Sequence, residues 1–419
     1  MQKRKVIISL VILSVISVIA ILYFVWGREV SVMGKTSAGK DEAETYISYS
    51  TDVTPVLNDC EYWINQYDDA DEVIMDEKAI EQLNEKILGT EEIANDIWNT
   101  EDESVRYAIC VERADLKETP TTQVLSSDES DDYYDDNQLS VLRLNSPVLI
   151  DDETADGSFY HVISYDYEGW AQAKCFAVCA DEKEWMKAQQ MQNFLVVTAP
   201  RMRLEQSEIE LTMGSRLRLL TKKEASEVEV ERSAYGCYVV EMPIRQGDGS
   251  YGVSYVTIPQ DEDVSVGYLS YTVENELTLA GKFLGNAYGW GGMYESVDCS
   301  QLVQEVFACF GMFLPRDVSE QMQIPTDFTL FHEEMTEKER VSILEDQQPG
   351  CILMFNGHEM IYLGRHDEEY YVLSSVGTLA EPSETEAQEI RSVIINTLSV
   401  KRGNGNTWKD ELVCAVTIR

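Results

Sequence analysis

The sequence predicts a multidomain protein with an N-terminal transmembrane helix, two small all-β barrels and a C-terminal α+β domain. Three observations support this prediction. Residues 6–26 are apolar and uncharged, the middle of the chain repeats apolar residues with a period of two, and the last third turns to helices followed by strands. The chain has 419 residues, of which 44% are hydrophobic, enough for two to four domains with their own cores.

The chain is strongly acidic, with a formal net charge of −42. Such a charge repels nucleic acid and anionic lipid headgroups, which argues against a DNA-binding, RNA-binding or peripheral lipid-binding role. Part of the charge lies in the run at residues 128–136, which is typical of a solvated loop.

The N-terminus predicts an anchor at residues 1–27, followed by a tether at 28–53. Lys3, Arg4 and Lys5 precede residues 6–26, whose helix would be about 31 Å long, close to the thickness of a bilayer's hydrocarbon core. The basic flank predicts that the rest of the chain lies outside the cytoplasm. A cleaved signal peptide is the alternative, but its apolar region is usually about 7–15 residues, and no clear A-x-A site is present after this run.

Residues 54–104 predict a small helical segment. Apolar residues recur there at spacings of three and four, and the segment is too short to be stable alone, so we expect it to pack on the domains after it. The residues that form this pattern are Trp63, Ile64, Tyr67, Ile80, Leu83, Ile87 and Leu88.

Two β-barrels are predicted, at residues 105–190 and 191–272. Both regions contain short apolar runs separated by turn residues, and Asp156-Gly157 is a hairpin signal. Residues 181–192 predict a short linking helix. From residue 273 to 419 the pattern predicts two helices, the second ended by Gly311, and strands at 351–355, 360–363, 370–374 and 393–398.

The cysteines do not indicate a metal site. There are nine, an odd number, and no C-x-x-C pair is present. Most lie among apolar residues and are expected to be small core side chains. We therefore predict few or no disulfides, no metal and no cofactor.

Cys299 is the strongest candidate for a nucleophile. It comes after a glycine-rich stretch at 285–292 and falls in the first turn of a predicted helix. The helix dipole and the free N–H groups of that turn stabilise a thiolate, and can lower a cysteine pKa from about 8.5 to roughly 3.5–7.5. His358, just after a predicted strand, is the candidate base.

These residues carry a resemblance to the NlpC/P60 cysteine peptidases. The family's P-Y-x-W-G-G and D-C-S-G-L segments are similar to Ala-Tyr288-Gly-Trp290-Gly-Gly and to Asp298-Cys299-Ser300-Gln-Leu. The later motifs f-G-i-x-L-P-R-d, with a glutamine after it, and G-H-V-x-i-Y-l-G resemble residues 310–321 and 357–364. The resemblance implies a papain-like α+β fold and a Cys299–His358 pair.

The resemblance also implies roles for neighbouring residues. Tyr288 would be an oxyanion or substrate contact, and Trp290 either a substrate wall or a core residue. Asp298 would cap the helix, bind a substrate amine, or both, and Ser300 would also contact substrate. Arg316 would form an ion pair under the site.

Two positions depart from the family pattern. Glu359 replaces an apolar residue after the histidine, and we expect it to raise the pKa of His358. The third catalytic position, usually His, Asn or Gln, falls on Ser374. Its hydroxyl would accept from the imidazole Nδ1–H and orient the base weakly.

Upstream, the chain resembles the multidomain members, in which a helical stabilising segment and two bacterial SH3-like (SH3b) domains precede the peptidase. The resemblance covers about residues 54–419 and implies a bacterial cell-wall protein. Together with the apolar run at 6–26 and its basic flank, it predicts a single-pass protein of a bacterial cell membrane with an extracytoplasmic catalytic domain. Its implied reaction is hydrolysis of peptidoglycan stem peptides, commonly between D-γ-glutamate and the diamino acid. Two alternatives are a non-catalytic wall-binding protein with a degenerate peptidase domain, and an acyltransferase on the same fold.

Overall fold

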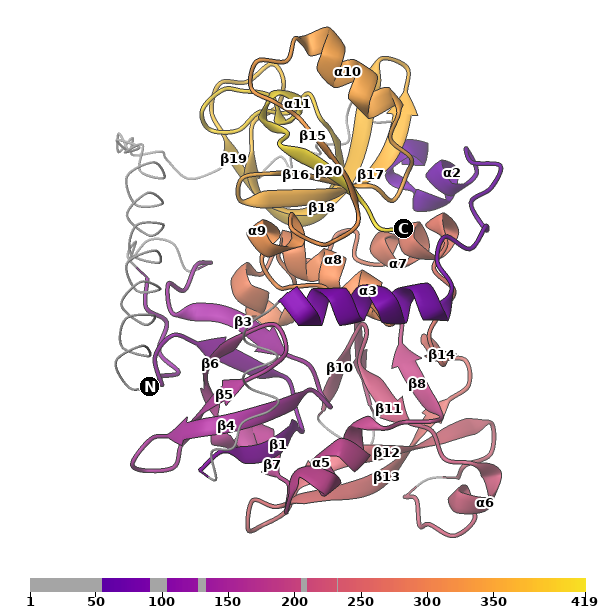
Figure 1. Ribbon diagram of the computed structural model, residues 1–419, viewed down its shortest axis with the longest axis vertical. Helices are drawn as coiled ribbons and strands as arrows, with labels where there is room; N and C mark the ends of the chain where they lie inside the picture. Colours follow the sequence, from indigo (N-terminus) through magenta and orange to yellow (C-terminus); the bar gives the residue numbers. More distant parts are fainter. Residues whose placement is uncertain (1–54, 91–103, 127–132, 205–208, 232) are drawn as a thin grey trace, which may run out of the picture. The chain divides into compact units, whose positions relative to one another are not determined.

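The computed structural model describes residues 55–90, 104–126, 133–204, 209–231 and 233–419 (Figure 1). The predicted anchor at 1–27 and tether at 28–53 lie outside these ranges. Within the described ranges, no helix is both long and apolar enough to cross a membrane.

The upstream helical segment shares its core with the C-terminal domain. Helix α2 begins after Asp59, whose carboxylate accepts the N–H of Glu61 at 2.9 Å, and the indole of buried Trp63 donates to the carbonyl of Leu57 at 2.9 Å. The predicted apolar positions Ile80, Leu83 and Ile87 are buried in the same cluster as the helices of the C-terminal domain. The elements are the 3₁₀ turn η1 (Pro55–Asn58), α2 (Cys60–Ile64) and α3 (Glu77–Thr90).

The first β-rich region forms one antiparallel sheet in the order β3-β2-β6-β5-β4-β1-β7. The hairpin predicted at Asp156-Gly157 joins β4 to β5, with Gly157 at a φ of 69°, and the predicted linking helix is α5 (Glu182–Gln189). The strands are β1 (Arg106–Cys110), β2 (Ala114–Lys117), β3 (Gln138–Leu142), β4 (Pro147–Glu153), β5 (Phe159–Ile163), β6 (Glu168–Gln172) and β7 (Phe176–Val178), with a 3₁₀ turn η2 (Ala173–Cys175).

The second β-rich region has three small antiparallel sheets around a separate core. Strand β8 is central to one sheet, between β11 and β14, while β9 pairs with β10 and β12 with β13. The elements are β8 (Phe194–Val197), β9 (Arg201–Arg203), β10 (Glu210–Thr212), β11 (Arg216–Arg218), α6 (Lys222–Ala225), β12 (Cys237–Arg245), β13 (Tyr251–Pro259) and β14 (Val264–Val266). The assignment of these two regions as SH3-like barrels stays a prediction.

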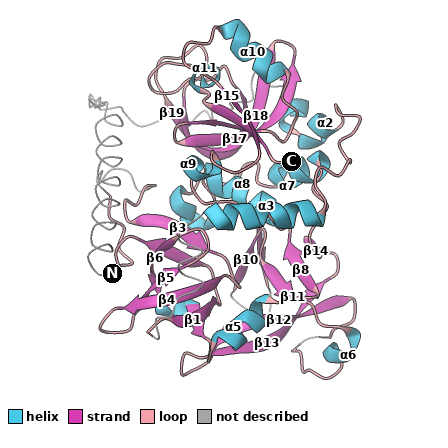
Figure 2. Ribbon diagram, in the orientation of Figure 1, coloured by secondary structure: helices cyan, strands magenta, loops and turns pink. Residues whose placement is uncertain are grey.

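The C-terminal domain packs helices on one antiparallel sheet, in the order β15-β20-β16-β17-β18-β19 (Figure 2). The four predicted strands correspond to β16 to β19, and β15, β20 and α10 are additional. The elements are α7 (Val273–Gly281), the 3₁₀ segment η3 (Trp290–Glu295), α8 (Cys299–Ala308), α9 (Val318–Gln321), β15 (Asp327–Leu330), α10 (Glu337–Glu345), β16 (Ile352–Phe355), β17 (His358–His366), β18 (Glu369–Leu379), β19 (Gln388–Thr397), α11 (Trp408–Glu411) and β20 (Cys414–Thr417).

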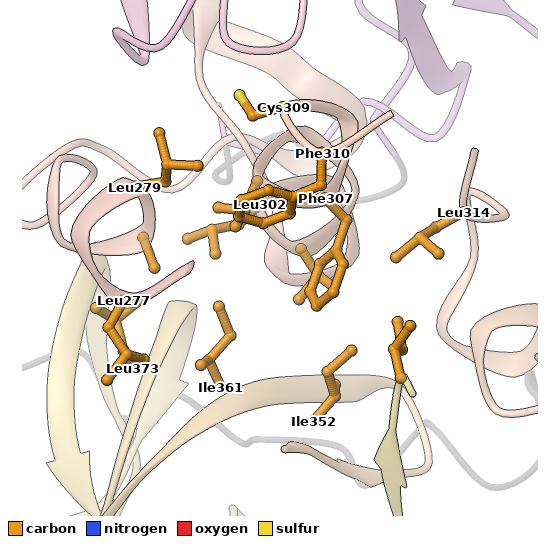
Figure 3. Packing of buried hydrophobic residues seen from close by; sticks show 14 of the residues in the cluster. Leu277, Leu279, Leu302, Phe307, Cys309, Phe310, Leu314, Ile352, Ile361 and Leu373 are labelled. Carbon is orange, nitrogen blue, oxygen red and sulfur yellow. The ribbon is translucent and has the colours of Figure 1, made fainter. Parts of the chain in front are cut away.

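The core of this domain lies between α8 and the sheet. Figure 3 shows Leu302 and Phe307 of α8 among the apolar side chains that face Ile352, Ile361 and Leu373 of the strands. Burial of such side chains stabilises the folded state by about 1.5–3 kcal/mol each. This packing holds the first turn of α8 against β17 and β18.

Candidate active site

Cys299 is the first residue of α8, as the sequence predicted. The glycine-rich segment before it turns sharply, since Gly291 and Gly292 have φ values of 53° and 85°, in the left-handed region that favours glycine. A Cβ at Gly291 would lie 2.7 Å from the side chain of Gln138, so glycine is also required for this close approach. The backbone N–H of Cys299 has no acceptor among the described residues, as is usual for a first helical turn.

A buried ion pair supports this end of the helix. Arg316 donates through Nη1 and Nη2 to Oδ1 and Oδ2 of Asp298, at 3.1 and 2.6 Å, and through Nη1 to Ser300 Oγ at 2.8 Å. Asp298 also accepts the N–H groups of Gly291 and Gln301, both at 3.0 Å. Asp298 therefore caps the helix, and Arg316 has its predicted structural role. Because Asp298 and Ser300 are committed to protein partners, their contact with substrate stays a prediction.

The thiol of Cys299 is held in its neutral form, contrary to the expected thiolate. Burial raises its pKa well above the ordinary value, and the negative charge of Asp298 raises it further, as does that of Glu359 when its carboxyl is ionised. A backbone hydrogen bond from Glu359 acts in the opposite direction, together with the charge of Arg316. The expectation of a low pKa was wrong because the helix terminus was considered without the desolvation of the buried sulfur.

His358 and Ser374 lie in contact across neighbouring strands. His358 is the first residue of β17, and its Nε2 is 3.1 Å from Oγ of Ser374 on β18. The sequence predicted the contact between His358 and Ser374 but not the ring nitrogen that makes it, since Nδ1 was expected to contact the hydroxyl. Ser374 therefore occupies Nε2 of the imidazole and not Nδ1.

The imidazole of His358 is also held neutral. It packs in contact with Phe355 and Trp408, with ring centroids 5.3 and 4.8 Å away. Burial lowers its pKa to about 3, and the positive charge of Arg402 lowers it further, against an opposing effect of Asp298. The predicted upward shift caused by Glu359 is therefore wrong, because desolvation outweighs nearby negative charge.

Glu359 points into the core rather than toward the imidazole. It is fully buried, and burial raises its pKa to about 8. Side chains alternate along a strand, so Glu359 faces the layer of α8 while His358 faces Phe355 and Trp408.

Three aromatic side chains pack together beside the glycine-rich segment that precedes Cys299, and one of them was missed from the sequence. Tyr288 is buried, whereas Trp290 is 42% exposed and is not a core residue. Tyr134, from the first β-rich region, lies with its ring 5.5 Å from Trp290 and 6.2 Å from Tyr288, and its hydroxyl is hydrogen-bonded to that of Tyr288. Burial raises the pKa of Tyr288 well above its usual range. Tyr134 lies within an acidic run, which carried no signal of a site.

Polar contacts attach the first β-rich region to the segment around the site. Gln138 donates to the carbonyl of Gly291 at 2.7 Å, and Arg316 Nε donates to Ser140 Oγ at 2.9 Å. Arg113 donates to the carbonyl of Gly292. The conformation of the glycine-rich segment therefore depends on residues far upstream.

The described residues contain no group of three or more His, Cys, Asp or Glu side chains placed to hold a metal ion. All nine cysteines lie in the described ranges, and none is in a disulfide.

Comparison with known proteins assigns the C-terminal domain. Residues 285–417 match the model of the NlpC/P60 family. The fold is similar to that of an NlpC/P60 endopeptidase from Photobacterium damselae subsp. piscicida, with 15% identity and a TM-score of 0.67 over 86% of this chain and 96% of the other. A Bacillus cereus ATCC 10987 NlpC/P60 family protein has 18% identity and a TM-score of 0.50, over 74% of this chain and 99% of the other. No curated protein matches.

The C-terminal domain is an α+β domain that places Cys299 at the start of α8 and His358 at the start of β17. The match over residues 285–417 identifies an NlpC/P60 domain in this part of the chain, and members of that family are generally cell-wall peptidases.

Proposed function

We propose that this protein is a cysteine peptidase that hydrolyses an amide bond in peptidoglycan stem peptides. One observation carries the proposal. Cys299 stands at the start of α8 and receives a backbone hydrogen bond from Glu359, the residue next to His358, while Ser374 occupies Nε2 of His358. This arrangement leaves Nδ1 of the imidazole for the thiol, as nucleophilic catalysis by a Cys/His pair requires.

The resting pair is neutral, so the thiol proton is transferred as the bond forms. His358 Nδ1 takes the proton of Cys299 while the sulfur attacks the substrate carbonyl. The unpartnered backbone N–H of Cys299 and the hydroxyl of Tyr288 stabilise the oxyanion. The imidazolium then protonates the leaving amine, and water, activated by the same imidazole, hydrolyses the thioester.

The bond proposed is that between D-γ-glutamate and the diamino acid. The rings of Tyr134 and Trp290 lie 5.5 Å apart, and we propose that they close one side of the approach to Cys299. Tyr134 comes from the region before the peptidase domain. A wall in that position favours short peptides with a free N-terminal L-alanine over polymeric peptidoglycan.

The test is release of diaminopimelate from L-Ala-γ-D-Glu-diaminopimelate, detected by mass spectrometry. We expect cleavage by the wild type and none by Cys299→Ala. The same assay on intact peptidoglycan separates fragments from polymer. Tight binding of the fragment without any turnover would contradict the proposal and favour the non-catalytic wall-binding alternative.

We also propose that residues 6–26 anchor the protein in a bacterial cell membrane, with the peptidase domain outside the cytoplasm. The proposal is supported by the uncharged apolar run and its basic flank. Cell fractionation with N-terminal sequencing tests it. A soluble secreted form that begins near residues 30–40 would contradict it.

A further inference from the structure

Glu359 is a buried acid beside the nucleophile that the proposed mechanism does not use. Its side chain is 0% exposed, and neither carboxyl oxygen has a hydrogen-bond partner among the described residues. It pairs with Met354 of β16, which in turn pairs with Cys414 of β20. Directly opposite residues of a sheet point to the same face, so the carboxyl lies among side chains that face α8.

The described residues around Glu359 provide no free cation. From the start of α8, Asp298 and Cys299 act on it, and from the segment before α9, Arg316 and Asp317 do. Arg316 is committed to Asp298 through two hydrogen bonds. The remaining elements are uncharged here: β16 contributes Met354, β20 contributes the Cys414 thiol, and residues 370–379 of β18 carry no charged side chain.

The carboxyl is therefore kept neutral at ordinary pH. A buried charge without a partner is strongly disfavoured, and burial with the negative charge of Asp298 raises the pKa of Glu359 to about 8. When Glu359 does ionise, its negative charge acts directly on the Cys299 thiol and on the Cys414 thiol.

We propose that Glu359 is a positioning residue that controls the ionisation of Cys299, permitting the thiolate when its carboxyl is neutral and opposing it when its carboxyl is charged. For catalysis the inference rests on the proposed function, but its effect on the thiol does not. This effect opposes the usual dependence of a cysteine on pH, in which the thiolate fraction increases as the pH rises. In this protein, the increase of Cys299 thiolate with pH becomes less steep above about pH 8, where Glu359 becomes a carboxylate.

Alkylation of Cys299 measures this effect without any peptide substrate. The rate constant for modification by iodoacetamide is followed from pH 6 to 10, with modification located by mass spectrometry. We compare the wild type with Glu359→Gln, which keeps the shape but cannot ionise. The control is Glu368→Gln, which removes an exposed acid in the turn between β17 and β18. Cys299→Ala gives the background from the other cysteines.

In Glu359→Gln, the alkylation rate should continue to rise tenfold per pH unit above pH 8. In the wild type and in Glu368→Gln it should flatten, so that at pH 9 the Glu359→Gln variant reacts about three- to tenfold faster than either. Superimposable profiles for the wild type and Glu359→Gln would overturn the inference.

A second measurement follows the carboxyl itself. The infrared C=O band of a protonated buried carboxyl is recorded in the wild type as the pH is raised, and the contribution of Glu359 is assigned by its loss in Glu359→Gln. Disappearance of this band with a midpoint near pH 8 supports the inference, and no change between pH 6 and 9 overturns it.

Peptide hydrolysis separates the two proposals. A difference in alkylation without any hydrolysis by the wild type supports the role of Glu359 and overturns the proposed function. Hydrolysis by the wild type, with no difference in alkylation between the wild type and Glu359→Gln, supports the proposed function and overturns the role of Glu359.

Discussion

Cys299 and His358 are both neutral in the resting protein, and this sets what each neighbouring residue can contribute. Burial raises the pKa of the thiol and lowers that of the imidazole to about 3. The proton must therefore move during attack, and the orientation of the imidazole matters at that moment. Ser374 supplies this orientation through an uncharged hydroxyl 3.1 Å from Nε2.

Replacement of the three residues should have graded effects. We expect Cys299→Ala and His358→Ala to nearly abolish hydrolysis, Ser374→Ala to reduce kcat/KM by about tenfold or less, and Ser374→His to leave it unchanged or raised. A neutral hydroxyl stabilises the imidazolium weakly, so its loss costs little. The measurement is release of diaminopimelate at several pH values. A loss in Ser374→Ala as large as that in His358→Ala would contradict this.

Arg402 should set the acid limb of the pH profile. Its positive charge lowers the pKa of His358, so Arg402→Ala should raise that pKa. The base is inactive when protonated, and the acid limb of kcat/KM should therefore move to higher pH. Arg402→Lys is the matched control because it keeps the charge. An unchanged acid limb in Arg402→Ala would show that this charge does not reach the imidazole.

At the scale of elements, the start of α8 depends on one buried ion pair. Arg316 is 2% exposed, and it satisfies both carboxylate oxygens of Asp298. Burial opposes its charge, but Asp298 raises its pKa above the ordinary value. Removal of one partner leaves a buried charge unpaired, which is far costlier than removal of both.

Arg316→Met should therefore lower the free energy of unfolding by about 3–5 kcal/mol. The double variant Arg316→Met/Asp298→Asn should recover part of this loss, since Asn still caps a helix. Urea unfolding provides the measurement, and Arg365→Met is the control because Arg365 pairs with Glu345 at the surface. Equal losses of unfolding free energy in Arg316→Met and Arg365→Met would show that the buried ion pair contributes no more to stability than the surface pair.

Local patterns predicted the elements near the site better than they predicted its chemistry. The helix that begins at Cys299 and strands β16 to β19 were predicted from apolar periodicity within a few residues. Strands β15 and β20 were missed because they pair with each other across a long stretch of sequence. The neutral state of Cys299 was missed because burial depends on the whole fold, whereas a helix terminus can be recognised locally.

At the scale of the whole molecule, regions before residue 285 contribute to the site. The first β-rich region contacts the glycine-rich segment through Gln138 and through Tyr134, whose ring packs against Tyr288. The predicted helical segment packs its apolar residues into the same core as α8. The identity of these contacts could not be predicted from sequence, because Tyr134 and Gln138 belong to no motif.

Tyr134→Ala should raise KM for the short peptide about tenfold and leave kcat less affected, because Tyr134 forms a wall and does not touch the reacting atoms. Tyr134→Phe is the matched control: it keeps the ring and loses only the hydrogen bond to Tyr288. Steady-state kinetics on the peptide check this. If Tyr134→Ala lowers kcat alone, Tyr134 acts by supporting Tyr288 and not by bounding the substrate.

Strand β20 lies between β15 and β16 in the sheet, although it follows both of them in the sequence. During synthesis, the helix with Cys299 leaves the ribosome long before Cys414 to Thr417 are made. The sheet beneath that helix cannot close until this strand arrives. On the proposed function, nascent chains that stall before residue 414 should therefore lack hydrolytic activity.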